Sequence, residues 1–207
     1  MKSFEPCQFD RKIYERELLE FEQLLINNNT LEENKQILPF FRQHPQLVAQ
    51  TGTLATKINS ADSIAYEFDL FDYRCDAVVG DLDSKHFCFI EFEDANNDSI
   101  FKSKQGKFKK EFAPRFEHGY SQIIDWLQEL YHQRGNATKM IERFGHFQIG
   151  YSACLVIGRD AFLDESNKIR FNWRSDYVKI DSKEVLVLTY DELLRFLKIR
   201  QSQIFPS

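Results

Sequence analysis

Three acidic residues, Asp76, Glu91 and Glu93, have the type and spacing that metal chemistry needs. They lie in two segments rich in aromatic and β-branched residues, 74–81 and 86–93, which are typical of strands joined by a polar turn. If the turn centres on residues 83 and 84, Asp76 pairs with Glu91, with their Cβ atoms about 5 Å apart. Side chains alternate along a strand, so Glu91 and Glu93 share a face. The pattern predicts three carboxylates on one patch of sheet.

Carboxylates this close repel one another and raise each other's pKa unless a cation joins them. Oxygen-only clusters suit Mg²⁺ or Mn²⁺. Such an ion lowers the pKa of a bound water and stabilises the charge that builds on a phosphodiester. The alternative is that Glu91 and Glu93 lie on a solvated edge strand. The run FCFIEFE at 87–93 is hydrophobic on both faces, which weighs against that alternative.

A second candidate region is the basic segment between Phe101 and Arg115. It carries six basic residues and one acid, Glu111, in a chain whose net charge is −5. The basic residues are Lys102, Lys104, Lys107, Lys109, Lys110 and Arg115. Concentrated positive charge on an acidic protein predicts binding to a phosphate backbone, with affinity but no sequence readout. The alternative is a solvated loop whose lysines keep the chain in solution.

The elements that must position these residues follow from hydrophobic periodicity. Helical spacing predicts helices over 10–27, 31–43, 115–134 and 191–200, with Thr30 and Glu33 as a capping box for the second. Pro45 and residues 50–53 are expected to break the helical pattern. Strands are predicted over 64–73, 74–81, 86–93, 151–158 and 184–188. This order predicts an α/β domain with a mixed β-sheet flanked by helices, 56–207, after an N-terminal helical section, 1–55.

Length and composition indicate an ordinary globular protein. The 207 residues are 43% hydrophobic and 14% aromatic, enough for a sizeable core. No apolar run approaches the roughly 18 residues of a membrane span, and the first ten residues contain no signal-peptide core. The four cysteines are far apart and lack metal-binding spacing. We therefore expect a cytoplasmic protein without a membrane partner.

The order of Asp76 and then Glu91-Phe92-Glu93 across a hairpin resembles the PD-(D/E)XK nuclease motif. Three later segments resemble those of Shedu-type anti-phage defence proteins: HGYSQIIDW at 118–126, IGR at 157–159 and TYDELL at 189–194. The four segments follow the order of that family and cover about residues 65–198. The resemblance implies a PD-(D/E)XK nuclease-like fold, Mg²⁺ or Mn²⁺ as cofactor, and a homo-oligomer.

Glu93 departs from the family pattern, in which a lysine at this position would place or activate the attacking water. Glu93 could instead act as a second metal ligand or as the base that accepts a proton from water. Lys104 could supply the missing positive charge from a loop. The other possibility is a degraded site that no longer cuts.

Several residues could support the acidic site. Gln122 and His118 lie four apart on one helical face, so both could face it, and Gln122 would then orient water or a carboxylate. Arg159 is expected to form a structural ion pair with Asp160, although it could also contact nucleic acid or a neighbouring subunit. Thr189 is expected to cap the last helix.

These observations predict a metal-dependent nuclease that cleaves DNA in bacterial anti-phage defence, with RNA not excluded. Asp76 and Glu91 would hold the metal ion, and Glu93 and Gln122 would complete the catalytic set. Lys104, Lys107, Lys109, Lys110 and Arg115 would bind the nucleic-acid backbone. One alternative is a catalytically silent nuclease-fold module for nucleic-acid sensing or oligomeric assembly. Another is a phosphoesterase or RNA-processing enzyme, because a fold does not fix its substrate.

Overall fold

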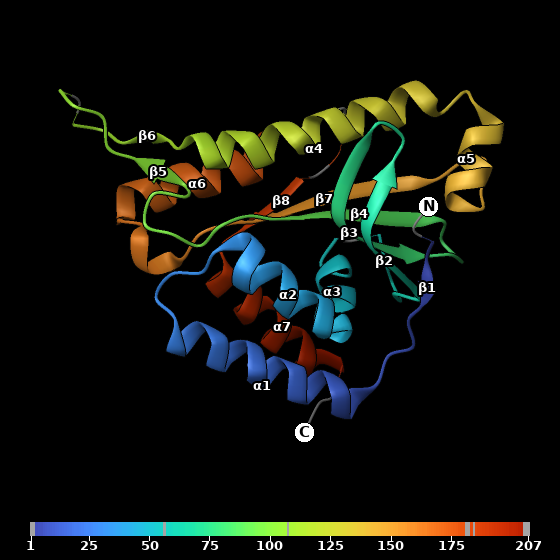
Figure 1. Cartoon of the computed structure of the whole chain (residues 1–207), viewed down its shortest axis with the longest axis horizontal. Helices are drawn as coiled ribbons and strands as arrows, with labels where there is room; N and C mark the ends of the chain where they lie inside the picture. Colours follow the sequence, from blue (N-terminus) through green and yellow to red (C-terminus); the bar gives the residue numbers. More distant parts are fainter. Residues whose placement is uncertain (1–2, 56, 107, 181–182, 184, 205–207) are drawn as a thin grey trace.

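A six-stranded mixed sheet forms the centre of the protein, with helices on both faces (Figure 1). The computed structural model describes residues 3–55, 57–106, 108–180, 183 and 185–204. In spatial order the strands are β1 (Glu5–Pro6), β2 (Ser63–Leu70), β3 (Tyr73–Asp81), β4 (His86–Phe92), β7 (Gly150–Val156) and β8 (Val185–Leu188). Neighbours from β1 to β4 are antiparallel, whereas β4, β7 and β8 are parallel. The predicted α/β class with a mixed, helix-flanked sheet is confirmed.

The helices divide between the two faces (Figure 1). One face carries α1 (Arg11–Asn27), the π-helical turn η1 (Glu33–Ile37), α2 (Leu38–Gln43), α3 (Pro45–Gly52) and α7 (Tyr190–Ile204). The other carries α4 (Pro114–Gln133), α5 (Ala137–Phe144) and α6 (Glu165–Tyr177). A small hairpin of β5 (Phe101–Lys102) and β6 (Glu111–Phe112) projects beyond the sheet beside α6, and a 3-10 turn, η2 (Asp160–Phe162), precedes α6.

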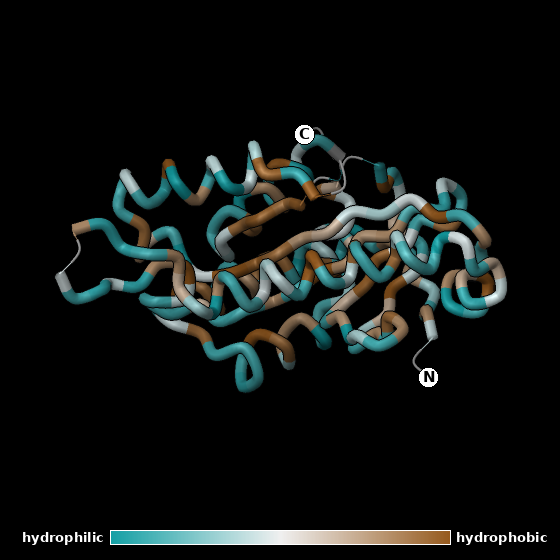
Figure 2. The backbone as a smooth tube through the Cα atoms, turned by 90° about the horizontal axis from the view of Figure 1, so that it is seen from above, coloured by the Kyte–Doolittle hydropathy of each residue, from teal (hydrophilic) through white to brown (hydrophobic). Residues whose placement is uncertain are grey.

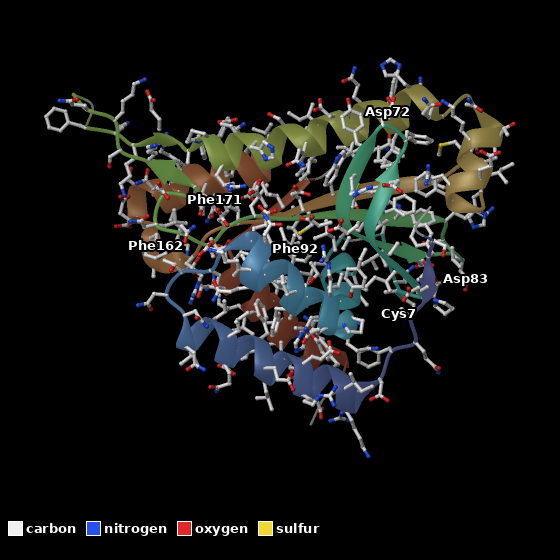
Figure 3. The ribbon with its side chains drawn as sticks, viewed as in Figure 1. Cys7, Asp72, Asp83, Phe92, Phe162 and Phe171 are labelled. Atoms are coloured by element: carbon white, nitrogen blue, oxygen red, sulfur yellow. The ribbon has the colours of Figure 1, made fainter. Side chains whose placement is uncertain are left out.

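Side-chain alternation along the strands produces two hydrophobic cores, one on each face. The central strands are the most apolar segments of the backbone, whereas the helices mix polar and apolar residues (Figure 2). Phe92 of β4 points toward α2 (Figure 3), where its ring stacks on Phe41 with centroids 4.2 Å apart. Phe89, on the opposite face, contacts Phe144 of α5 with centroids 6.1 Å apart. The sheet is therefore covered on both sides, and only the ends of its strands remain for a site.

The register of the β3–β4 hairpin agrees with the prediction. Asp81 pairs with His86 and Ala77 with Ile90, so the same register brings Asp76 opposite Glu91. The turn holds this register because the Asp81 carboxylate accepts hydrogen bonds from the backbone N–H groups of Ser84 and Asn59. Turn chemistry and alternation together fix where the two acids meet.

Two local expectations were wrong. Thr30 does not cap a helix at 31: Leu31 forms a β-bridge with Ala95, and the helical chain begins at Glu33 without a side-chain cap. Pro45 begins α3 instead of breaking the pattern, because proline is tolerated in a first helical turn, where its missing N–H has no partner to lose.

The remaining elements differ from the predictions mainly at their ends. The strand predicted over 64–73 ends at Leu70, and a turn joins it to β3. Residue 184 of the predicted last strand lies outside the described residues, and β8 begins at Val185. Strands β1, β5 and β6 and helices α3, α5 and α6 lie outside the predicted ranges. None of the helices in the described part of the chain is long and apolar enough to cross a membrane.

Candidate functional site

Asp76 lies where the pairing of β3 with both of its neighbours is interrupted. Opposite it on β2, Glu67 has a left-handed backbone with φ of +48°, which is uncommon outside glycine. The β2–β3 register accordingly passes from Tyr66↔Ala77 to Phe68↔Cys75 without an intervening pair. Freed from regular pairing, the Asp76 carboxylate turns toward the end of β4 and accepts a hydrogen bond of 2.8 Å from the backbone N–H of Phe92.

Glu91 shares a side-chain hydrogen bond with Asp76, which raises the pKa of Glu91 and lowers that of Asp76. Burial raises the pKa of Glu91 well above its usual range, and the charges of Asp76, Glu93 and Glu33 raise it further. Burial also raises the pKa of Asp76 to about 6, although the hydrogen bonds from Phe92 and Glu91 work against the rise. The two strands therefore hold a carboxyl pair that readily shares one proton.

Glu93 follows β4 and is almost completely buried, with an exposed fraction of 1%. Its Oε1 lies 3.1 Å from Nδ1 of His118, and its Oε2 lies 3.0 Å from Nη1 of Arg115, as an ion pair without hydrogen-bond geometry. Both partners come from the first turns of α4. This helix approaches closely because residue 119 is glycine, where a Cβ would lie only 3.0 Å from Cγ of Glu93. Burial raises the pKa of Glu93, but His118 and Arg115 oppose that rise.

Two further acids, Glu33 and Asp94, join the site through Arg115. The Arg115 guanidinium lies 3.0 Å from the Asp94 carboxylate and 3.2 Å from that of Glu33. Asp94 also accepts a hydrogen bond of 2.7 Å from the backbone N–H of Glu33, which fixes the start of η1 against the end of β4. Burial and the charges of Glu93 and Asp76 raise the pKa of Glu33 to about 7. The N-terminal helical section thus contributes a residue to the site.

Negative charge exceeds positive charge in this cluster. Three carboxylates contact the Arg115 guanidinium; they belong to Glu33, Glu93 and Asp94. The carboxyl groups of Asp76 and Glu91 interact electrostatically with Glu93, which brings the number of acids in the cluster to five. A hollow of about 480 Å³ adjoins the cluster and is lined by residues that include Asp94, Lys102, Arg115 and His118. We call the five carboxyl groups with Arg115 and His118 the acidic cluster.

The arrangement accounts for a metal ion only in part. No group of three or more His, Cys, Asp or Glu side chains within the described ranges is placed to hold a metal ion. Glu93 is directed toward α4, whereas Asp76 and Glu91 face each other across the hairpin. Two carboxylates with water and phosphate oxygens nevertheless form a common environment for Mg²⁺. The donor set is oxygen only, so Asp76 and Glu91 fit that ion or Mn²⁺.

Gln122 lies one turn beyond His118 on α4. Its side-chain oxygen, Oε1, is buried and has no hydrogen-bond partner among the described residues. An unpaired buried polar atom costs free energy, and such atoms are often kept for function. This observation is compatible with the expected role of Gln122, for which the structure records no contact with the carboxylates.

The basic segment lies mostly on the β5–β6 hairpin, where Lys102 lines the hollow beside the acidic cluster. Lys104 pairs with Glu111 at 3.2 Å, so Arg115 and not Lys104 supplies positive charge beside Glu93. Lys109 is exposed and Lys110 is half-buried, while Lys107 lies outside the described residues. Of the predicted backbone-binding residues, Arg115 is thus placed within the acidic cluster, and the described lysines are placed on the hairpin.

The strand-end motif 157–159 and the last helix have structural roles. Gly158 adopts a left-handed backbone with φ of +70°, and a Cβ there would lie 2.6 Å from Ile100. Arg159 forms its ion pair with Asp191. The expected pairing with Asp160 was wrong. Thr189 and Glu192 form a capping box, which confirms Thr189 as the cap.

Comparison with known proteins supports the resemblance of these motifs. A family model described as "Shedu protein SduA, C-terminal" matches residues 30–194, which are 165 of the 207 residues. The comparison with curated proteins gave no match. The matched range contains all five carboxylates of the acidic cluster, Arg115, His118 and the strand-end motif. The chain belongs to the Shedu family.

Proposed function

We propose that the acidic cluster is the active site of a PD-(D/E)XK-type nuclease that cleaves DNA with Mg²⁺ or Mn²⁺. Membership of the Shedu family suggests a role in anti-phage defence. The observation that carries the proposal is the excess of carboxyl groups over positive charge at a break in strand pairing. Buried carboxylates are retained at such a cost chiefly where they bind a cation or move a proton.

Asp76 and Glu91 would hold the ion, because together they share one proton that a divalent cation would replace. When bound, the ion would lower the pKa of a water and stabilise charge on the phosphate. Glu93, whose pKa is raised by burial, would accept a proton from water. Arg115 would supply the positive charge that the lysine of the motif usually brings, and Gln122 would orient the water or a carboxylate.

A catalytically silent module is the second candidate, and the contacts of Glu93 favour it. Both of its oxygens are already engaged, by His118 and by Arg115, so its proton-accepting role needs one of these contacts to open. His118 is the more mobile candidate, because 63% of its side chain is exposed, against 42% for Arg115. The silent module would still bind nucleic acid or assemble but would not cut.

The proposal is tested by incubating the full chain with plasmid DNA, linear DNA and RNA, in Mn²⁺, Mg²⁺ or EDTA. We expect cutting of DNA that requires the metal and that falls by roughly 10²-fold or more in Glu91→Gln. The matched control is Asp83→Asn, which removes an exposed carboxylate at the other end of the same hairpin and should cut normally (Figure 3).

Metal binding is measured in parallel as the rise in melting temperature on adding Mn²⁺. A rise in the wild type that Glu91→Gln abolishes, without cutting of any substrate, would support the silent module. Cutting that is unchanged in Glu91→Gln would reject the acidic cluster as the active site. Cutting of RNA alone would reject DNA as the substrate.

A further inference from the structure

Helix α6 exposes a row of large apolar side chains. Ile169, Trp173 and Tyr177 are 64%, 58% and 71% exposed, and their spacing of four residues puts them along one side of the helix. The side that packs in the core carries Asn167 and Phe171 instead. Trp173 and Tyr177 stack on each other, with ring centroids 5.8 Å apart and planes 21° apart. Exposed apolar surface of this extent marks an interaction site.

This row is tied to the basic hairpin by two arginines of α6. Arg170 donates a hydrogen bond of 2.8 Å to the backbone carbonyl of Lys110, and its guanidinium lies 4.7 Å from the ring centre of Phe101. Arg174 lies 4.9 Å from the ring centre of Phe112. A hollow of about 510 Å³ forms between hairpin and helix, lined by Phe112, Ile169, Arg170, Trp173, Arg174 and Val178. Hairpin and helix thus lie side by side and line one hollow (Figure 1).

The same surface reaches the acidic cluster across the first turns of α4. Arg174 pairs with both carboxylate oxygens of Glu117, at 2.9 and 3.0 Å. The next residue, His118, contacts Glu93. A chain lying along α6 and the hairpin is therefore separated from the acidic cluster by the width of one helix, about 10 Å.

We propose that Trp173 and Tyr177, with Lys102, Lys104 and Lys109 of the hairpin, form a platform for single-stranded DNA. Unstacked bases would stack on the two rings, while the exposed lysines would contact the phosphates. A duplex keeps its bases stacked on one another and cannot use the rings in this way. A second copy of the chain would cover the rings but would bring two sets of lysines together. Charge complementarity therefore favours a polyanion with accessible bases.

This inference rests on the proposed nuclease function and names the form in which substrate is held. It places the single-stranded part of a DNA, such as a frayed end or a gap, on the platform and the cleaved bond at the acidic cluster. Binding and cleavage are separable, because stacking needs no metal.

The test measures binding in EDTA by the full chain, using a labelled oligothymidylate of roughly 12 nucleotides, within the usual range of single-strand sites. Trp173 is one of two tryptophans, and the other, Trp126, is 1% exposed, so stacking should quench fluorescence that comes from Trp173. Trp173→Leu should weaken binding by roughly 10-fold. Trp173→Phe keeps an aromatic ring and should bind within about 3-fold of the wild type but without the quench.

Tyr131→Leu is the matched control, because this tyrosine is 41% exposed near the far end of α4 and should not affect binding. The platform is rejected if a duplex of equal length binds as tightly as the single strand, or if Trp173→Leu binds like Tyr131→Leu. An oligouridylate that binds more tightly than the oligothymidylate would overturn DNA as the ligand. A dimer in sedimentation that Trp173→Leu dissociates, without any quench by DNA, would assign the surface to a second copy. Quenching without metal-dependent cutting would contradict the proposed nuclease and leave the platform intact.

Discussion

Two arginines of this protein meet carboxylates in opposite ways. The Arg159 side chain is 11% exposed, bonds both oxygens of Asp191, and donates its other N–H groups to the backbone carbonyls of Asn28 and Leu25. The Arg115 side chain is 42% exposed and is shared among three carboxylates, with further acids behind them. One paired acid and two backbone carbonyls that accept from the same guanidinium make a structural joint. An excess of acids leaves charge that only a cation or a proton can neutralise, which is what a reactive site needs.

The largest expected effect tests the structural joint. Arg159→Met removes a nearly buried guanidinium from Asp191 and from the carbonyls of Asn28 and Leu25, so we expect the free energy of unfolding to fall by about 3–5 kcal/mol. Urea denaturation measures the change. The matched control is Arg195→Met, whose side chain is 51% exposed beside Asp160, and which should cost only about 0–1 kcal/mol. Equal losses of unfolding free energy in Arg159→Met and Arg195→Met would mean that Arg159 is not a structural joint.

The next effect concerns Arg115, which should matter for chemistry more than for folding. In Arg115→Met we expect cleavage to fall by roughly 10²-fold, because the site loses its positive charge. That factor corresponds to about 2.7 kcal/mol in the barrier. Removing a cation raises the pKa of a neighbouring carboxylate, so the rise of activity with pH should move to higher pH. Arg115→Lys should keep most of the activity.

A second substitution sharpens this test. Glu93→Lys would restore the lysine of the family motif, so cleavage should partly return in the Arg115→Met, Glu93→Lys double variant. Arg16→Met, which removes an exposed arginine of α1, is the control and should have no effect. An Arg115→Met variant that loses activity without any change in its pH profile would assign Arg115 a purely structural role.

The smallest effect is the dependence of stability on pH. The pKa of Asp76 is raised from an ordinary 3.8 to about 6 in the folded protein. The folded state therefore holds the proton more tightly, and stability without metal should fall as pH rises from about 4 to about 6. Asp76→Asn keeps an acceptor for the Phe92 N–H but removes the charge. At pH 8 in EDTA it should exceed the wild type by on the order of 2 kcal/mol.

Melting curves at pH 4 and pH 8 measure this difference, which should vanish at pH 4. Asp83→Asn is the control and should change stability equally at both values. Mn²⁺ should reduce the difference in stability between Asp76→Asn and the wild type at pH 8. Only the wild type has the Asp76 carboxylate to bind the ion and is stabilised by it. A wild type that is more stable than Asp76→Asn at pH 8 without metal would contradict the carboxylate repulsion inferred here.

What could be predicted from the sequence was local. The β3–β4 register follows from one polar turn and from alternation, so the meeting of Asp76 and Glu91 was predictable. The order of helices and strands followed from periodicity in the same way. Strands of two residues, such as β5 and β6, carry no periodicity and were missed.

The rest of the acidic cluster depends on contacts between distant segments. Glu33 reaches the acidic cluster because Leu31 forms a β-bridge with Ala95. No sequence pattern near residue 33 predicts that bridge. Arg115 was predicted to bind a phosphate backbone because its neighbours in sequence are lysines. Its neighbours in space are acids, because α4 begins at the end of β4. Charge counted along the chain therefore did not reveal that Arg115 lies beside Glu93.

The bridge between Leu31 and Ala95 also bears on how such a protein can be rearranged in evolution. Residues from about 30 onward supply Glu33 to the acidic cluster and Phe41 to the ring of Phe92, so they must be inherited together with the sheet. A fusion or recombination joint at residue 56 would separate a carboxylate from its partners and uncover one face of β4. Joints before residue 30 would keep both, and the family match begins at that point. The helical section from residue 30 is thus inherited with the strands that carry the acidic cluster, and variation in architecture is expected ahead of it.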